Sequence, residues 1–365
     1  MSALGDEIKA MIGENGPISV ERFVGLALGH PQHGYYMKQD PFGAAGDFTT
    51  APEISQMFGE LIGLWAAEVW ASMGSPNPLR LIELGPGRGT LVSDALRAAR
   101  VAPEFRAALD VWLVETSPML AAIQHDTLLT CGAPIAWASA LSETPDGPAI
   151  VLANEFLDAL PIRQYVRSGR EWRERQIGVD AAGELKFVLA QKPEPALRTP
   201  AAEGEMLEIS ASGHRLVYAL ASRLAKQGGA ALFIDYGHET TGFSDTLQAL
   251  RAHRPVDPLS EPGDCDITAH IDFDAMARSA RAAGAAVYGP IDQGDFLRAI
   301  GLEERAQALM ARASEPSRAA GIEAARQRLA GKGESEMGAL FKIMVIANRA
   351  LPVPAGFQTP SSAAE

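Results

Sequence analysis

The stretch "LRLIELGPGRGTL", Leu79 to Leu91, decides the fold of this 365-residue chain. An apolar run ends at Leu84, and glycines then stand at the alternate positions Gly85, Gly87 and Gly89. Glycines in a turn between a strand and a helix bring the backbone close to a ligand, and the first turn of the helix offers free N–H groups. The stretch therefore predicts a strand, a ligand-binding loop and a helix, with a plain connecting turn as the alternative.

Beyond this stretch the chain alternates short apolar runs with helical patterns. The runs "VWLVE", "PIAWA", "AIVLAN" and "GAALFIDYG" are typical of strands, and amphipathic segments such as "TLVSDALRAAR" separate them. Strands that alternate with helices form a parallel sheet through right-handed crossovers. The late run "MGALFKIMVIANR" is expected to be a last buried strand that completes the edge of the sheet. The sequence predicts an α/β, Rossmann-like fold with helices on both faces of the sheet.

Further regions flank or interrupt this core. The N-terminal part, in which Ser19 is expected to cap a helix, reads as helical and contains a long loop rich in Gly and Pro. Period-two alternation with Gly turns predicts an inserted antiparallel β meander. The predicted regions are 1–75 for the N-terminal helical extension and its loop, 76–245 for the core, about 161–210 for the meander within it, 246–350 for a C-terminal helical region with closing strands, and 351–365 for a loose tail.

Charge and composition narrow the functional classes. A net charge of -13 argues against a nucleic-acid substrate, and no run reaches the roughly 20 apolar residues of a membrane span. Cys131 and Cys265 stand in no CxxC or Cys/His pattern, so neither a disulfide framework nor a metal site is expected. The opening "MSALGDEIKAMIGENG" has neither the apolar core of a signal peptide nor the Arg-rich pattern of a transit peptide. These features predict a soluble cytoplasmic protein.

The glycine spacing bears on the ligand. The dinucleotide fingerprint is GxGxxG, whereas this loop reads GxGxG with Pro86 inside it. Glu83 stands two residues before the first glycine, where its carboxylate would repel a pyrophosphate and attract the sulfonium and ammonium groups of S-adenosylmethionine. Charge therefore favours the cationic cofactor.

Two further positions suit a nucleoside. Glu115 ends the second strand of the core, where a carboxylate can accept hydrogen bonds from both hydroxyls of a ribose. Adenosyl and nicotinamide cofactors both carry that ribose, and a solvated strand-end carboxylate is the alternative. Trp137 and Ala138 end the third strand and could contact an adenine ring, although Trp137 can equally belong to the core.

Six separated blocks resemble one family. The order "IELGPGRG", "VETSP" and "VLANEFLDALP" resembles a class I S-adenosylmethionine-dependent methyltransferase. The blocks "GDFTTAPEISQMFGELIG", "LIELGPGRGTL", "ANEFLDALPIRQY", "FIDYG", "DITAHIDF" and "MGALFKIM" together resemble the MidA family, from about Ile18 to Met344. The mitochondrial member of that family is an assembly factor for respiratory complex I and methylates an arginine of a partner subunit.

The resemblance implies a seven-stranded methyltransferase sheet, S-adenosylmethionine as methyl donor and a protein substrate, with an iron–sulfur subunit of complex I as a candidate. Since no mitochondrial presequence is recognised, it also implies a bacterial cytoplasmic relative. The block at Gly46, Asp47, Phe48 and Thr49 is expected to close over the cofactor. The cofactor-loop positions carried over from the family are Glu83, Gly85, Pro86, Gly87 and Gly89, with Glu115 as the ribose carboxylate.

The acceptor is expected at "ANEFLDALP", immediately after the fourth strand, because open α/β sheets bind ligands at the carboxyl edge. An arginine acceptor is protonated, and carboxylates can localise its lone pair on one nitrogen. Glu155 would hold the guanidinium in a bidentate pair. Asn154, a second catalytic candidate that is also expected to contact the cofactor, would offer its carbonyl oxygen to an N–H of the acceptor. Asp158 is a second carboxylate or a turn cap, and Asp47 is a fourth catalytic candidate or a turn residue.

The sequence leaves the roles of several other residues open. Tyr236 can line the acceptor pocket or end a strand, and His270 with Asp272 is not assigned as a catalytic base. The basic residues of the meander form either a solvated hairpin face or a docking surface for an acidic partner. They are Arg163, Arg167, Arg170, Arg173 and Arg175.

Three other functions stay open from the sequence. The first is a nicotinamide-dependent oxidoreductase on a similar sheet, which the glycine spacing disfavours. The second is a non-catalytic assembly chaperone that binds the cofactor as a structural ligand. The third is a methyltransferase that acts on another acceptor, such as a glutamine or a small molecule.

Overall fold

The structure, a computed structural model, describes residues 2–38, 40–41, 43, 47 and 49–357. The chain forms two compact units. Unit 1 contains residues 1–48, 157–216 and 240–272, and unit 2 contains residues 49–156, 217–239 and 273–365. Residues 1–75 are therefore shared between the units, because the helix after residue 55 belongs to unit 2.

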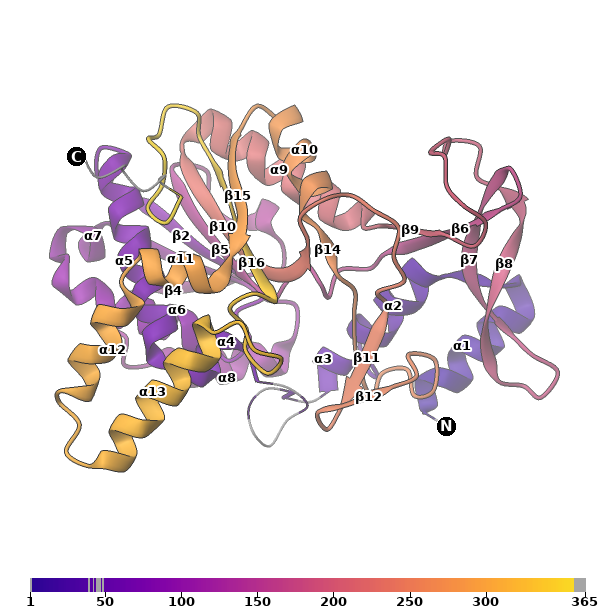
Figure 1. Cartoon of the computed structure of the whole chain (residues 1–365), viewed down its shortest axis with the longest axis horizontal. Helices are drawn as coiled ribbons and strands as arrows, with labels where there is room; N and C mark the ends of the chain where they lie inside the picture. Colours follow the sequence, from indigo (N-terminus) through magenta and orange to yellow (C-terminus); the bar gives the residue numbers. More distant parts are fainter. Residues whose placement is uncertain (1, 39, 42, 44–46, 48, 358–365) are drawn as a thin grey trace. The chain divides into compact units, whose positions relative to one another are not determined.

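Unit 2 contains seven strands of the large sheet, which run in the order β15-β16-β10-β5-β2-β3-β4 (Figure 1). The five strands from β10 to β4 run parallel to one another. This topology confirms the predicted seven-stranded Rossmann-like sheet. The bounds are β2 Leu79–Leu84, β3 Leu109–Val114, β4 Ile135–Ala138, β5 Ala149–Asn154, β10 Gly229–His238, β15 Ala286–Asp292 and β16 Phe341–Ala347.

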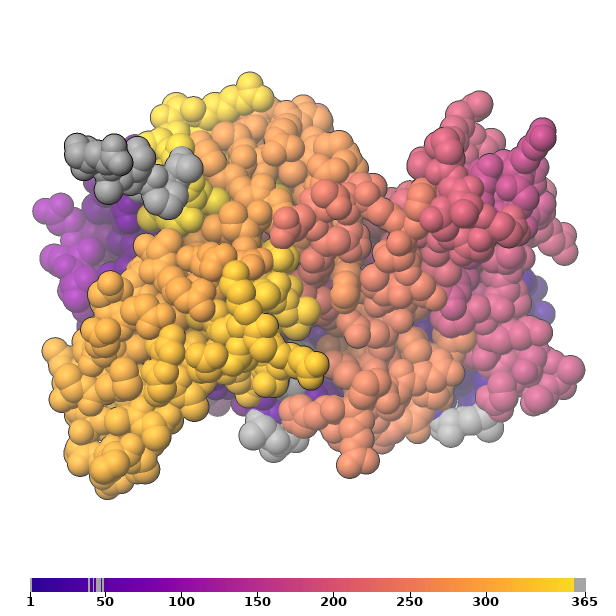
Figure 2. Space-filling view, viewed as in Figure 1, coloured from indigo at the N-terminus to yellow at the C-terminus, as the bar shows by residue number. Residues whose placement is uncertain are grey.

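Helices connect these strands in unit 2. Helices α12 and α13 follow β15, and their surface is visible in orange in Figure 2. Helix α9, Ala211–Gln227, contributes its last 11 residues, from Val217 onward, to this unit. The remaining bounds are α4 Ala51–Ile54, α5 Gln56–Ser72, α6 Thr90–Ala98, α7 Pro103–Ala108, α8 Pro118–Leu128, α10 Phe273–Ala282, α11 Gln293–Ala299, α12 Leu302–Met310 and α13 Pro316–Ala330.

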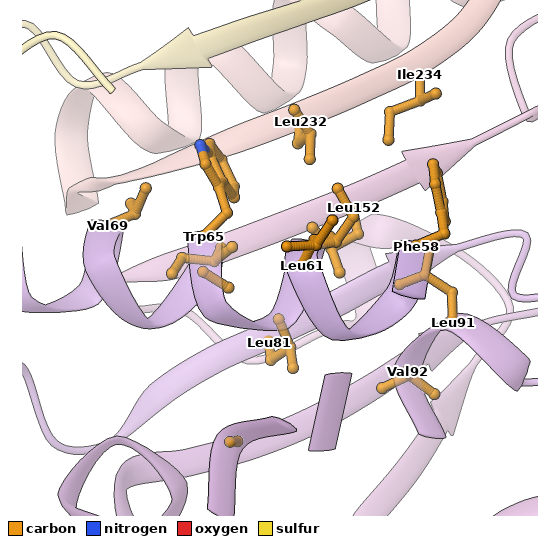
Figure 3. Close-up of a cluster of buried hydrophobic side chains, with 14 of the residues drawn as sticks. Phe58, Leu61, Trp65, Val69, Leu81, Leu91, Val92, Leu152, Leu232 and Ile234 are labelled. Atoms are coloured by element: carbon orange, nitrogen blue, oxygen red, sulfur yellow. The ribbon is translucent and has the colours of Figure 1, made fainter. Parts of the chain in front are cut away.

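The core of unit 2 lies between α5 and the sheet. Figure 3 shows Trp65 and Leu61 of α5 facing the strand residues Leu81, Leu152 and Leu232. All five side chains are at most 3% exposed. Burying a large apolar side chain contributes about 1.5–3 kcal/mol, so this contact anchors α5 on the strands that carry the glycine loop.

The last strand occupies a different place from the one predicted. Strand β16 was expected at the edge of the sheet, but it pairs antiparallel with β10 on one side and with β15 on the other. The last five residues of β16, from Ile343 to Ala347, are fully buried. A strand so apolar needs neighbours on both sides, and the shorter apolar run of β15 takes the edge instead.

Unit 1 combines helices with two small sheets. The predicted meander forms β6 to β9, in which β7 pairs antiparallel with β6 and β8. Ser19 caps α2 as predicted, because its hydroxyl accepts the N–H of Arg22 at 3.1 Å. The bounds are α1 Ala3–Asn15, β1 Ile18–Ser19, α2 Val20–Gly29, α3 Tyr35–Lys38, β6 Arg163–Ser168, β7 Glu171–Val179, β8 Leu185–Pro193, β9 Met206–Ile209, β11 Gln248–Arg251, β12 Arg254–Val256, β13 Asp266–Thr268 and β14 Ile271–Asp272.

None of the described helices is both long and apolar enough to cross a membrane.

Candidate functional site

The glycine loop of unit 2 follows β2 and ends at the first turn of α6. Gly85, Gly87 and Gly89 have φ angles of 62°, 54° and 80°. These left-handed conformations cost a residue with a side chain roughly 1–3 kcal/mol, which explains the alternating glycines. A Cβ atom on Gly85 would also stand 2.7 Å from the ring of Phe156. The sequence therefore places glycine where the backbone must be both left-handed and close to its neighbour.

Glu83 is buried beneath this loop. Its side chain lies on β2, opposite Leu152 of β5, and the residue is 4% exposed. Burial raises the pKa of Glu83 to about 8, although the N–H of Val92 donates to its carboxylate. The atom Oε2 has no hydrogen-bond partner among the described residues. A buried acceptor without a partner is costly, so a cationic ligand group suits this position.

The predicted ribose carboxylate belongs to a hydrogen-bonded network. Oε1 of Glu115 accepts the N–H groups of Thr116 and Ser117 at 2.8 and 2.7 Å. Oε2 accepts from Nε2 of Gln124 at 3.0 Å. Burial raises the pKa of Glu115, and these three donors oppose the rise. The carboxylate is therefore held rigidly at the carboxyl end of β3.

Trp137 and Ala138 lie beside Glu115, at the end of β4. Nε1 of Trp137 donates to Oε1 of Gln124 at 2.9 Å. The carbonyl of Ala138 accepts the N–H of Glu115 at 2.9 Å. Trp137 is half-buried and packs against the apolar core of unit 2.

Asn154 and Glu155 form a corner at the end of β5. Glu155 has a φ angle of 49°, which is unusual for a residue other than glycine. Its Oε1 accepts from Nδ2 of Asn154 and from the N–H of Ala51, both at 3.1 Å. Oδ1 of Asn154 is buried and has no hydrogen-bond partner in the described part of the chain. Strain and unmet acceptors often occur together at functional sites.

A second carboxylate, on β10, is hydrogen-bonded to the backbone of this corner. Asp235 of β10 is 1% exposed, and its Oδ2 accepts the N–H of Phe156 at 3.2 Å. The N–H of Glu155 donates to the carbonyl of Ile234 at 2.8 Å. Two neighbouring backbone groups of the corner are therefore fixed to β10, which explains how Glu155 keeps its left-handed conformation.

The segment before α5 contacts the glycine loop. Glu53 of α4 accepts a hydrogen bond from the hydroxyl of Thr90 and lies 3.5 Å from a guanidinium nitrogen of Arg88. Thr49 precedes these contacts and is half-buried. Gly46 and Phe48, the other residues predicted to close over the cofactor, lie outside the described residues.

Asp47 and Asp158 belong to unit 1. The hydroxyl of Tyr35 donates to Oδ2 of Asp47 at 2.6 Å, and the N–H of Ala252 donates to its Oδ1 at 2.7 Å. Asp158 is 7% exposed and lies near Asp266. Burial and the charges of Asp158 and Asp47 raise the pKa of Asp266 to about 7. The structure thus gathers these three carboxylates in one unit, while Glu155, Asn154 and Glu83 lie in the other.

The basic residues of the meander are largely paired. Arg163 lies 2.6 Å from Glu21, and Arg173 lies 2.9 Å from Glu171. Arg175 lies 2.9 Å from Asp245, with its guanidinium over the ring of Phe187. These contacts favour a structural interpretation of the basic face over a docking surface.

Sequence reasoning missed four residues that organise the site. Gln124 and Asp235 are buried polar side chains inside apolar patterns, and that contrast was a usable signal. Glu53 and Arg88 offered no signal, because their contact depends on how α4 meets the loop.

The comparisons with known proteins agree on one family. A model described as putative S-adenosyl-L-methionine-dependent methyltransferase matches residues 61–291. The chain is 40% identical to a Danio rerio protein over 83% of this chain and 77% of the relative, and 37% identical to a Mus musculus protein over 88% and 77%. Both relatives are named protein arginine methyltransferase NDUFAF7, mitochondrial.

Two solved structures are similar over nearly their whole length. A Burkholderia thailandensis protein bound to S-adenosylhomocysteine has a TM-score of 0.83 and 29% identity, with 97% of this chain and 94% of that chain covered. A native structure from the same species has a TM-score of 0.83 and 30% identity, with coverages of 98% and 94%.

The predicted location needs correction. The expectation of a bacterial cytoplasmic protein is wrong, because the curated relatives of this chain are mitochondrial proteins of eukaryotes. That expectation relied on the lack of a presequence pattern, and targeting segments carry no information on the fold that the relatives share.

Proposed function

This chain belongs to the MidA family of methyltransferases with S-adenosylmethionine as cofactor, and from that premise we propose that it methylates an arginine of a protein partner. The names of the curated relatives support the arginine acceptor. The family resemblance extends the proposal to assembly of respiratory NADH:ubiquinone oxidoreductase, with an iron–sulfur subunit as the candidate partner. The observation that carries the proposal is the Glu155 carboxylate, held at the carboxyl edge of β5.

The described residues of unit 2 fit the cofactor. When bound, S-adenosylmethionine supplies an electrophilic methyl group on a positively charged sulfur. Glu83 and Asn154 each keep a buried oxygen that has no hydrogen-bond partner among the residues that the structure describes, and these oxygens suit the cationic groups of that ligand. We assign cofactor contacts to Glu83, Gly85, Pro86, Gly87, Gly89, Glu115, Trp137, Ala138, Asn154 and Thr49, with Gly46 and Phe48 retained from the family resemblance.

Glu155 is the proposed partner of the acceptor. Its Oε1 accepts from Ala51 and Asn154, and we assign the carboxylate to a guanidinium N–H. A carboxylate at one nitrogen opposes delocalisation and directs the lone pair of another toward the methyl group. The new C–N bond replaces the C–S bond, and the methylated guanidinium releases one proton to solvent. Orientation of this kind lowers the activation barrier of a reaction between two bound reactants by about 7–11 kcal/mol.

Asp158 and Asp47 remain predicted acceptor contacts. Asp158 lies in the block that also carries Glu155, and Asp47 lies in the block that contains Thr49. Their single Asn variants test each role separately, with turnover and cofactor affinity as the two measurements.

The decisive experiment combines binding with transfer. Calorimetry with S-adenosylhomocysteine should show a single site, and folded protein that does not bind it would reject the proposed cofactor contacts. The purified protein and a radiolabelled methyl donor are then added to a lysate from cells that lack the protein. Mass spectrometry of the labelled band should find methylarginine. No label would support a cofactor-binding chaperone, and label on glutamine or on a small molecule would reassign the acceptor.

A further inference from the structure

Helix α4 contacts both sides of the proposed site within unit 2. Its first residue, Ala51, donates its N–H to Oε1 of Glu155 at 3.1 Å. Its third residue, Glu53, accepts the hydroxyl of Thr90 through Oε1, and its Oε2 lies 3.5 Å from Nη1 of Arg88. Arg88 belongs to the glycine loop, and Thr90 is the first residue of α6. One short helix therefore joins the glycine loop after β2 to the corner after β5.

The backbone of α4 is held as one turn. Pro52 stands in this turn, where its ring fixes φ and its missing N–H is no loss. The carbonyl of Thr50 accepts the N–H groups of Glu53 and Ile54 at 3.0 and 3.2 Å. Ala51 is 0% exposed, and α5 follows directly with its apolar face buried on the sheet. A displacement at Glu53 therefore also displaces the N–H of Ala51.

The bond from Thr90 is the stronger of the two contacts at Glu53. A hydroxyl that donates to a carboxylate makes a charge-assisted hydrogen bond, which is stronger than one between neutral groups. The contact with Arg88 is longer than an ordinary hydrogen bond, and both side chains are partly exposed, so it contributes little. The position of α4 is therefore set mainly by the start of α6, at the end of the glycine loop.

We propose that Glu53 is a positioning residue that makes the placement of Glu155 depend on a ligand in the glycine loop. This inference rests on the proposed function, in which the loop binds the cofactor and Glu155 binds the acceptor. When a ligand holds the loop, the start of α6 is held with it. Thr90 then fixes α4 through Glu53, and α4 fixes the carboxylate of Glu155 through the N–H of Ala51. The acceptor carboxylate is thus oriented in the cofactor-bound protein and less restrained in the empty one.

Hydrogen exchange at the amide of Ala51 measures this coupling without any acceptor. In the wild type, saturating S-adenosylhomocysteine should slow that exchange by at least about fivefold, because α4 opens less often. In Glu53→Ala the ligand should still bind by calorimetry, but the slowing should fall below about twofold. Thr90→Val removes the same hydrogen bond from the other side and should act alike. Glu53→Gln keeps an acceptor oxygen for Thr90 and should retain the slowing of the wild type.

A double-mutant cycle on the rate of methyl transfer tests the step from α4 to Glu155. Residues that act through one network are not additive, so Glu53→Ala should lower the rate at least about fivefold in the wild type and less than about twofold in Glu155→Gln. The matched control is Glu208→Ala. Glu208 also accepts a threonine hydroxyl, that of Thr246, but both residues lie in unit 1. Its effect on the rate should be the same in both backgrounds.

The failures of the inference and of the proposed function are distinguishable. Folded wild type that does not bind S-adenosylhomocysteine, or unchanged turnover in Glu155→Gln, rejects the proposed function. If both results are as proposed, exchange at Ala51 that the ligand does not slow in the wild type overturns the coupling through α4. Full slowing in Glu53→Ala overturns it as well, as does an equal loss of rate from Glu53→Ala in both backgrounds. If Glu53→Ala does not fold, Thr90→Val takes its place with the same expectations.

Discussion

The carboxylate of Glu155 accepts the backbone N–H of Ala51 at 3.1 Å, which joins the corner after β5 to the first residue of α4. One hydrogen bond thus connects the predicted acceptor carboxylate to the helix that follows the predicted closing block. Glu155 has two separable tasks at this contact. One of its oxygens accepts this backbone N–H, and its charge is what we assign to the proposed acceptor.

The first prediction separates these two tasks. In Glu155→Gln the amide oxygen can still accept from Ala51, so the affinity for S-adenosylhomocysteine should stay within about twofold. The charge is lost, and kcat should fall about 100-fold or more, as for removal of one electrostatic contact in a transition state. Calorimetry and single-turnover transfer measure the two effects.

The control for this variant is Asp180→Asn. Asp180 also accepts two backbone N–H groups through one oxygen, but it lies at the exposed hairpin turn of the meander. Its kcat should equal that of the wild type. Unchanged turnover in Glu155→Gln would remove Glu155 from the proposed mechanism.

The second prediction concerns pH and Glu83. Burial raises the pKa of Glu83 to about 8, so the free folded protein holds a proton there between the unfolded value near 4.5 and pH 8. A cationic cofactor favours the charged carboxylate, and binding in that window must release the proton. Affinity for S-adenosylmethionine should therefore rise with pH, by at most about tenfold per pH unit, between pH 5.5 and 7.5.

Calorimetry in two buffers of different ionisation enthalpy measures that proton directly. Glu83→Gln cannot release it, so the slope of affinity against pH should vanish in this variant. A wild type whose affinity is flat over the same range would show that Glu83 stays ionised in the free protein.

The third prediction concerns Gly85. In Gly85→Ala the residue would meet both a left-handed backbone, with φ at 62°, and the Phe156 ring 2.7 Å from its Cβ atom. We expect a loss of about 2–4 kcal/mol in the free energy of unfolding, from backbone strain and overpacking together. Gly74→Ala is the matched control, because Gly74 has a φ angle of 81° and open space around it.

In urea titration the free energy of unfolding of the control Gly74→Ala should fall by about 1 kcal/mol. This value isolates the cost of the left-handed backbone. Equal losses of unfolding free energy in the two variants would mean that the contact with Phe156 does not affect stability.

Local patterns were enough to predict the sheet. The apolar run "LRLIEL" matches β2, Leu79–Leu84, and "AIVLAN" matches β5, Ala149–Asn154, because buried parallel strands are continuous apolar segments. The place of β16 could not be predicted in this way. Whether a late strand lies at an edge or between two others depends on pairing across the chain, which the periodicity of one segment does not contain.

The residues of the site show the same difference between what local patterns predict and what depends on contacts across the chain. The positions that follow strands, such as Glu115 and Asn154, were predictable because the carboxyl ends of parallel strands share one edge. For Gln124 the sequence offered only the signal of a polar residue inside an apolar pattern, because its partners depend on the distance from α8 to the ends of β3 and β4. Sequence spacing also grouped Asp158 with Glu155, whereas the chain passes from unit 2 to unit 1 between Phe156 and Leu157.

The last prediction concerns Asp235, which fixes the corner from β10. Its two oxygens accept the N–H groups of Phe156 and Tyr236 at 3.2 and 2.9 Å. In Asp235→Asn only one of these bonds can form, and the NH₂ group would face a backbone donor at a position 1% exposed. The free energy of unfolding should fall by about 1–3 kcal/mol. Because Glu155 would leave its strained conformation, kcat should fall further than the affinity for S-adenosylhomocysteine. A purely structural role would lower stability alone and leave kcat of the folded fraction unchanged, and that result would separate Asp235 from the placement of Glu155.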